Sequence, residues 1–232
     1  MTGYANNSHT SAEDIYHRLK EDILILRLKP GQMISENEVA NTYNVSRTPI
    51  KTAFMRLKGE NYVDIVPQKG TFVTPLDIKY VKDAIYMRSV LETDMLKRII
   101  QSSNYNDVVA LLEQNMNKQR EVLNPGSVDP ENFYDVDNHF HFTLFHAMNR
   151  VEMWNIVQYC QVYYTRFRML DYTATARYQQ LVTEHERILN ALKQKDMALL
   201  ESVVFDHLHG ALYILADRIE TDFKEYFVKP TA

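Results

Sequence analysis

The sequence predicts a mainly α-helical chain in two parts, an N-terminal winged helix-turn-helix and a C-terminal all-helical antiparallel bundle of six to seven helices. Only 6 Gly and 7 Pro occur in 232 residues, which is fewer than loop-rich and all-β folds use. Apolar residues recur at helical spacing through most of the chain, and a strand-like pattern is confined to one segment near residues 62–74. With 45% hydrophobic and 24% charged residues, each part can bury a core.

The composition also indicates the compartment. The single cysteine, Cys160, cannot form a disulfide within the chain, as expected of a reducing cytoplasm. Residues 1–11 are polar and lack the apolar core of a signal peptide, so we expect a disordered N-terminus and no leader. No uninterrupted apolar run approaches the ~18 residues of a membrane span. We therefore expect a cytoplasmic protein with no membrane partner.

Two short helices open the N-terminal part, for which we expect residues 12–75. The first begins at Ser11, a candidate N-cap, and continues to about Leu28, where a Lys-Pro-Gly sequence ends it. The second follows Ser35, which has Glu38 three residues later in the spacing of a capping box, and runs to about Tyr43.

A third helix is predicted from Arg47 to about Lys58, with Ser46 as its cap. Arg47 and Lys51 lie four residues apart on one face, and Ser46 and Thr48 lie at its leading end. A helix N-terminus that presents Arg, Ser and Thr suits phosphate oxygens and base edges in a DNA major groove. The spacing alone is equally compatible with a solvated face of a small helical domain.

Two short strands, Tyr62–Val66 and Thr71–Thr74, complete this part as a hairpin or wing. The net charge of −4 argues against nucleic acid only if it is spread evenly. Up to Pro75 there are nine Lys or Arg against eight Asp or Glu, or +1, and the remainder carries 17 against 22, or −5. The charge of the whole chain therefore does not exclude DNA binding by the first part.

The amino-acid sequence of this part resembles the DNA-binding domain of GntR-superfamily transcription regulators from about Ile15 to Thr74. Three segments carry the resemblance: LKPGQMISE at residues 28–36, NVSRTPIK at 44–51 and PQKGTFV at 67–73. The resemblance implies that the start of the third helix and the tip of the wing contact DNA. The residues at these positions are Ser46, Arg47, Thr48, Lys51, Lys69 and Gly70.

Two positions depart from the family pattern. Lys51 stands where the family usually has an arginine, so a bidentate contact to guanine is not expected there. Asn37 stands where some relatives have an arginine that contacts DNA. We therefore expect an operator preference different from that of the best-known members.

Residues 76–232 are predicted to form the bundle, because long amphipathic helices alternate with short connections. The clearest helix start is an Asp-Pro-Glu sequence at Asp129. The predicted helices are Asp77–Gln101, Tyr105–Leu123, Pro130–Asn149, Glu152–Leu170, Ala176–Lys193 and Met197–Tyr226.

One carboxylate and three imidazoles of the bundle have the spacing of a metal site. Asp137 and His141 are four residues apart on one helix face. His185 and His207 lie equally far from the predicted helix break at residue 196, so an antiparallel hairpin brings them to the same height. Such a set suits Zn²⁺ first, with nickel, manganese or cobalt as alternatives. Hydrogen-bonded core histidines would show the same spacing.

The bundle also resembles the FCD ligand-binding domain of the FadR-like GntR subfamily. The segments that carry this looser resemblance are YMRSVLE at residues 86–92, DNHFH at 137–141, EHE at 184–186 and DHL at 206–208. The resemblance implies a divalent metal held by Asp137, His141, His185 and His207. It also implies that Arg88 binds the carboxylate of a small organic acid, for which the guanidinium fork is suited. The alternative for Arg88 is a surface ion pair with Glu92.

The function expected from these features is that of a DNA-binding transcription regulator, a homodimeric repressor on a near-palindromic double-stranded operator, whose bundle binds a metal and a small carboxylate effector. Two alternatives stay open. A metal-dependent hydrolase would use the Asp and three His centre to activate water, with Glu184 and Glu186 as candidate bases. A regulator without metal would bind a long acyl ligand in the bundle.

Overall fold

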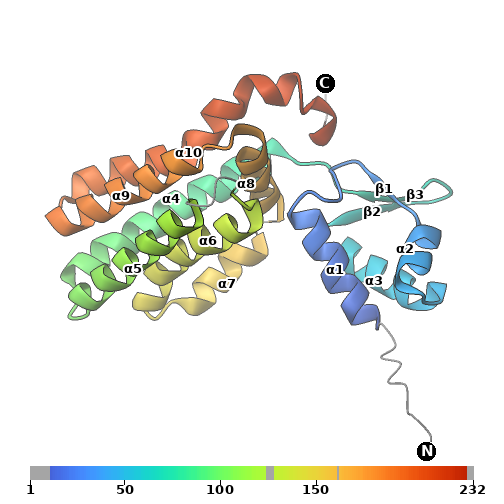
Figure 1. The fold of residues 1–232 in the computed structure, drawn as a ribbon, viewed down its shortest axis with the longest axis horizontal. Coiled ribbons are helices and arrows are strands. Elements are labelled where there is room, and N and C mark those ends of the chain that lie inside the picture. Colours follow the sequence, from blue (N-terminus) through green and yellow to red (C-terminus); the bar gives the residue numbers. More distant parts are fainter. Residues whose placement is uncertain (1–10, 124–127, 161, 229–232) are drawn as a thin grey trace, which may run out of the picture. The chain divides into compact units, whose positions relative to one another are not determined.

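The computed structural model describes residues 11–123, 128–160 and 162–228, which divide into two compact units (Figure 1). The first unit extends to Leu76 and includes the chain from Glu225, and the second covers Asp77–Lys224. A parallel bridge joins Leu76 to Phe227 within the first unit. Of the expected disordered N-terminus, residues 1–11, all but Ser11 lie outside the described residues.

The first unit begins with helix α1 (Ala12–Leu24). The Ser11 side chain accepts from the Asp14 amide at 3.1 Å and the Asp14 carboxylate accepts from the Ser11 amide at 2.9 Å, which forms a capping box. The helix ends before the expected Leu28, because Leu26 adopts a left-handed conformation with φ of 63°.

Helices α2 (Glu36–Tyr43) and α3 (Arg47–Gly59) form the predicted helix-turn-helix. Asn44 ends α2 at φ 50° and ψ 49°, the left-handed region that asparagine tolerates. The apolar face of α3 packs against α1. Ile15 and Ile23 of α1 and Ile50 of α3 are completely buried in this core.

A three-stranded antiparallel sheet completes the unit, with strand order β1-β3-β2. The strands are β1 (Met33–Ile34), β2 (Val63–Val66) and β3 (Gly70–Val73). The hairpin of β2 and β3 was predicted, whereas β1 has two residues and no alternation to reveal it. Gly70 at the hairpin turn has φ of 127°, a conformation that favours glycine.

The described residues of the second unit form seven helices, within the predicted six to seven, although bounds were predicted for only six (Figure 1). They are α4 (Ile78–Gln101), α5 (Tyr105–Leu123), α6 (Pro130–Ala147), α7 (Val151–Cys160), α8 (Val162–Thr175), α9 (Tyr178–Gln194) and α10 (Met197–Glu220). Helix α5 packs on α6 and α9, and α10 packs on α9 and α4. The single predicted helix Glu152–Leu170 corresponds to α7 and α8. The last helix ends at Glu220, and a short 3₁₀ turn, Lys224–Tyr226, follows it.

Helix α8 is buried along most of its length although it carries charges. Arg166 is fully buried, Arg168 is 6% exposed and Asp171 is 1% exposed. A helix that is polar on several faces is normally exposed to solvent. Its burial therefore concentrates charged groups in the interior of the bundle, where they require partners.

By length and composition, α10 could cross a membrane, and it is the one described helix that meets this test. Of the 18-residue window concerned, 39% is buried inside the unit. A helix that supplies one wall of a bundle core has the same composition. Leu200, Val204 and Leu208 of α10 are such core residues.

Candidate metal centre and DNA interface

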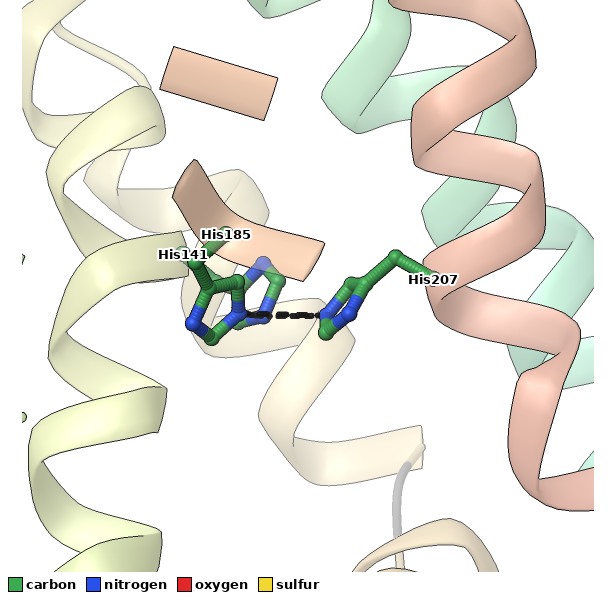
Figure 2. A group of neighbouring side chains, drawn as sticks. All are labelled: His141, His185 and His207. Atoms are coloured by element: carbon green, nitrogen blue, oxygen red, sulfur yellow. Dashed lines mark hydrogen bonds between the residues drawn. The ribbon is translucent and has the colours of Figure 1, made fainter. Parts of the chain in front are cut away.

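Three histidines from three helices converge in the bundle interior (Figure 2). His141 comes from α6, His185 from α9 and His207 from α10, and they are 1%, 0% and 7% exposed. Their Nε2 atoms are 3.2 Å apart for His185 and His207, and 3.3 Å apart for each of the other two pairs. The rings point toward one common position.

The hairpin of α9 and α10 brings two of these histidines level. Lys195 ends α9 in a left-handed conformation with φ of 56°, and the side chain of Asp196 caps α10 by accepting from two of its first amides. Because His185 and His207 are equally distant from Asp196 along the chain, the antiparallel helices place them side by side. The sequence prediction of equal height is confirmed for this pair.

A side-chain oxygen atom lies within hydrogen-bond distance of the Nδ1 of each imidazole. The pairs are His141 with Glu92 Oε2 at 2.7 Å, His185 with Gln119 Oε1 at 2.8 Å, and His207 with Glu184 Oε2 at 3.0 Å. An oxygen acceptor at Nδ1 places the ring proton there, so each Nε2 carries a free lone pair. This second layer of partners is typical of histidines that ligate a metal.

The orientation of the Gln119 amide is fixed by a chain of hydrogen bonds. Asn115 Nδ2 donates to the Val136 carbonyl at 2.9 Å, and Gln119 Nε2 donates to Asn115 Oδ1 at 2.7 Å. The Gln119 oxygen is therefore the atom that faces His185. Gln119 is completely buried, and its role was not predicted from the sequence.

The charge state of the three rings favours a cation. Burial lowers the pKa of His141 below its usual range and lowers the pKa values of His185 and His207 further, so all three are neutral at pH 7. Because each neutral ring carries its proton at Nδ1, no proton is available for a hydrogen bond between the Nε2 atoms that face one another. Tetrahedral Zn²⁺ at ~2.0–2.1 Å from each nitrogen would separate the nitrogens by about 3.3 Å, close to the observed spacing. The residues present therefore fit a divalent metal.

Asp137 lies beside this cluster, on the same face of α6 as His141. Its Oδ1 is 3.7 Å from His185 Nε2 and its Oδ2 is 3.8 Å from His141 Nε2. Asp137 is 1% exposed and accepts a hydrogen bond from Arg168. Of the four predicted ligands, the three histidines meet at one position and the carboxylate is directly adjacent.

Arg88 lies in the interior of the bundle. The alternative prediction, an ion pair with Glu92 at the surface, has the right partner, but the pair is buried. Arg88 Nε donates to Glu92 Oε1 at 2.6 Å, but both side chains are at most 2% exposed. Glu92 also accepts from His141, so a single carboxylate joins Arg88 to a predicted metal ligand. Arg88 Nη1 donates to the Tyr164 hydroxyl at 3.0 Å, and Nη2 has no hydrogen-bond partner among the described residues.

The two glutamates that flank His185 in the sequence have different surroundings. Glu184 accepts from His207 and from Arg177 Nη1, the latter at 3.0 Å. Glu186 is on the outside of the bundle, where it pairs with Arg120 at 2.6 Å. Neither glutamate faces the Nε2 cluster as a base for a bound water would, which removes the structural support for the hydrolase alternative.

The candidate DNA-contacting residues are exposed on the first unit. The first turn of α3 contains no acidic residue, and the Ser46 side chain makes no capping hydrogen bond. Arg47 Nη2 donates to Asn37 Oδ1 at 2.8 Å, so an α2 residue orients the arginine at the start of α3. The exposed candidates on α3 and at the β2–β3 turn are Ser46, Arg47, Thr48, Lys51, Lys69 and Gly70.

Comparison with known families decides the identity of both units. Residues 11–73 match the family described as bacterial regulatory proteins, gntR family. Residues 83–210, more than half of the chain, match the FCD domain. The chain belongs to the GntR family, in the FadR-like subfamily with an FCD domain. The helical bundle of this GntR regulator is therefore its FCD domain, and the hydrolase alternative is wrong because the family consists of transcriptional regulators and not of enzymes.

Two relatives are similar to this chain over most of their length. The HTH-type transcriptional repressor RspR of Escherichia coli K12 is 28% identical over 200 residues, which cover 84% of this chain and 85% of that protein. The gluconate operon transcriptional repressor of Bacillus licheniformis is 25% identical over 191 residues, which cover 79% of this chain and 77% of that protein. Both are named as repressors.

Solved structures agree on the fold. A GntR regulator from Rhodococcus sp. RHA1 has a TM-score of 0.71 at 16% identity, and E. coli McbR/YncC has a TM-score of 0.67 at 20% identity. Each comparison covers 89% of this chain and 97% of the other. At this identity the likeness concerns the fold alone.

The neutral state of the buried histidines predicts a pH dependence of stability. Without metal, the free energy of unfolding is expected to fall as the pH falls from 7.5 to 5.5. The unfolded chain takes up protons near pH 6.5, whereas the folded chain, in which burial lowers the pKa of His185 and His207, does not. The stabilisation is therefore complete above pH 6.5 and is lost on acidification. Urea unfolding in the presence of a chelator measures it, and a constant free energy over this interval would contradict neutral rings.

Proposed function

We propose that this GntR regulator is a metal-dependent repressor whose DNA binding responds to a small organic acid. The observation that carries the proposal is the buried set of three imidazoles, each with its Nδ1 on an oxygen and its Nε2 directed at one position. Packing of the bundle alone does not require three lone pairs to converge on one position. A cation at that position would find its ligands already oriented.

The proposed metal ligands are His141, His185 and His207, with Asp137 as the fourth. Zinc is the expected metal, with nickel, manganese or cobalt as alternatives. When bound, the metal would supply a positive charge and an open coordination position for an oxygen atom of the effector. The buried charges near this position do not suit a long acyl chain, which requires an apolar cavity.

The proposed effector anchor is Arg88. Its guanidinium is completely buried, and its Nη2 is available for a carboxylate oxygen. Glu92 connects this anchor to His141, so an acid bound at Arg88 and a metal bound at the histidines would influence each other through one side chain. The effector alters DNA binding to the extent that it binds the DNA-competent and DNA-incompetent states with different affinities.

The proposed DNA contacts are those of α3 and of the turn between β2 and β3. Since the recognition helix of one chain reads one half-site, a homodimer would read a near-palindromic operator in the cytoplasm, where the chromosome is. Exposed apolar side chains on α4 and α10 provide a candidate face for the second copy. These side chains are Tyr86, Val90, Phe205 and Tyr213, from 46% to 70% exposed.

Selection of DNA by the full-length protein tests this function. The protein is saturated with Zn²⁺ and incubated with a pool of random duplexes, and bound duplexes are amplified and sequenced. We expect two similar half-sites in inverted orientation, about one helical turn apart. Mass measurement of the complex is expected to give two chains per duplex. Recovery of duplexes without a common sequence would contradict a specific operator, and a single half-site with one chain would contradict the dimer.

A further inference from the structure

Two buried arginines each have one nitrogen without a partner. Arg88 Nη2 and Arg168 Nη1 make no hydrogen bond to any described residue, and the two residues are 0% and 6% exposed. A buried donor left without an acceptor destabilises the folded state, and more so when it is charged. Two such donors in one domain therefore point to an acceptor that is not a side chain of this chain.

Both guanidiniums lie at the same part of the bundle. They lie near the Tyr164 ring, with the Arg88 Cζ 5.1 Å and the Arg168 Cζ 5.8 Å from its centroid. Each is also connected by hydrogen bonds to a proposed metal ligand: Arg88 reaches His141 through Glu92, and Arg168 donates directly to Asp137. The two free nitrogens thus belong to two different guanidiniums, and each guanidinium is connected by hydrogen bonds to a different proposed ligand of one site.

The charges of the buried side chains give a second argument. Four arginines and four acids have side chains at most 11% exposed in the second unit, so they leave no net charge among the described residues. Bound to three neutral histidines, a divalent cation adds two positive charges. A buried net charge is costly unless it is balanced. The eight residues are Arg88, Arg166, Arg168, Arg177, Glu92, Asp137, Asp171 and Glu184.

We propose that the effector is a small dicarboxylate, with one carboxylate bound by Arg88 and the other by Arg168. Two carboxylates supply an acceptor to each free nitrogen and balance the charge of the metal. A monocarboxylate would satisfy one arginine and leave the other unpaired. Two separate guanidiniums also favour two separate acid groups over one compact dianion such as phosphate. This inference rests on the proposed function, because it adds the second anchor to an effector site formed by Arg88 and the metal.

Paired probes that differ by one carboxylate test the proposal. L-lactate and L-malate are both 2-hydroxy acids, and malate has the additional carboxylate. Each is titrated calorimetrically into the full-length, zinc-loaded protein, and orthophosphate is titrated separately. We expect malate to bind at least tenfold more tightly than lactate and orthophosphate more weakly than malate. Equal binding of the two acids, or tighter binding of orthophosphate, would overturn the dicarboxylate.

Variants at Arg168 assign the second anchor. Arg168→Gln is expected to abolish the tenfold preference, so that malate and lactate bind with about equal affinity. Because Arg168 also contacts Asp137, metal content and helicity are measured in parallel, and Arg168→Lys, which keeps the charge, is examined as well. A folded Arg168→Gln protein that still prefers malate tenfold would overturn the role of Arg168, whereas Arg168→Lys, which retains a positive charge for the second carboxylate, is expected to keep part of the preference. Arg120→Gln, at an exposed arginine paired with Glu186, is the matched control and is expected to retain the preference.

The results also separate this inference from the proposed function. Binding of lactate without a preference for malate overturns the dicarboxylate alone and leaves the Arg88 site intact. A zinc-loaded protein that binds neither acid overturns both the dicarboxylate and the effector part of the proposed function. A protein that takes up none of zinc, nickel, manganese and cobalt overturns the metal part of the proposed function, and with it the charge argument for two carboxylates.

Discussion

Replacement of both His185 and His207 by alanine is expected to reduce bound metal from about one equivalent per chain to none. The double variant retains one imidazole and the adjacent Asp137, which are too few ligands for a stable site. Elemental analysis after dialysis measures the metal directly. A ligand that binds only the folded state at 100 times its Kd stabilises it by ~2.7 kcal/mol. A chelator should therefore lower the Tm of the native protein and leave that of the double variant unchanged.

Two controls make this result specific to the cluster. His139 and His146 lie on α6 with His141 but are exposed. Their joint replacement by alanine removes the same number of imidazoles, and it should leave one equivalent of metal and the response to the chelator. Because alanine at buried positions creates cavities, His185→Gln with His207→Gln is measured too, and circular dichroism verifies that each variant is helical. A folded double variant that retains a full equivalent of metal would refute the site.

Arg47→Glu is expected to weaken operator binding by at least about 100-fold at physiological salt. The substitution removes a charged donor at the start of α3 and places a negative charge next to the phosphates on both copies of a dimer. Arg47 is exposed and, among the described residues, its side chain hydrogen-bonds only to Asn37, so the free energy of unfolding should change by no more than ~0.5 kcal/mol. Fluorescence anisotropy with the selected operator measures the affinity.

The matched control for this variant is Lys58→Glu. Lys58 is exposed at the last turn of α3, away from the proposed contact, and the substitution changes the charge of the chain by the same amount. Its effect on affinity should be far smaller, because the proposed docking brings phosphates within range of the first turn of the helix and not of its last. If Arg47→Glu binds the operator with unchanged affinity, the assignment of α3 as the recognition helix is contradicted.

Local features of the sequence predicted most of the secondary structure. Ser11 as a candidate N-cap marked the start of α1, and an Asp-Pro pair marked the start of α6. Where helix ends differed, as after Leu24, the chain turned through a left-handed residue that no helix-stop signal in the sequence identified. The two-residue strand β1 was missed because its pairing with β3, and not its own pattern, makes it a strand.

The Arg88–Glu92 pair shows what helical spacing cannot decide. Residues four apart on a helix form an ion pair equally well in water and in the interior. In water such a pair contributes ~0.2–0.5 kcal/mol, whereas breaking a buried pair by removing one partner costs ~3–5 kcal/mol. The sequence predicted that the two side chains meet, and the packing of α4 against α6 and α8 determined that they meet inside the bundle.

The sequence by itself determined the two-part architecture, the helix-turn-helix and the pairing of His185 with His207, because capping, periodicity and the symmetry of a hairpin act within one or two neighbouring helices. Only the tertiary structure decided which groups surround those histidines. Gln119 on α5, Glu92 on α4 and Arg168 on α8 reach the site from helices distant in the sequence. Periodicity fixes which face of a helix is inward, but not which helix packs against it, and the hydrogen bonds that orient the imidazoles depend on that neighbour.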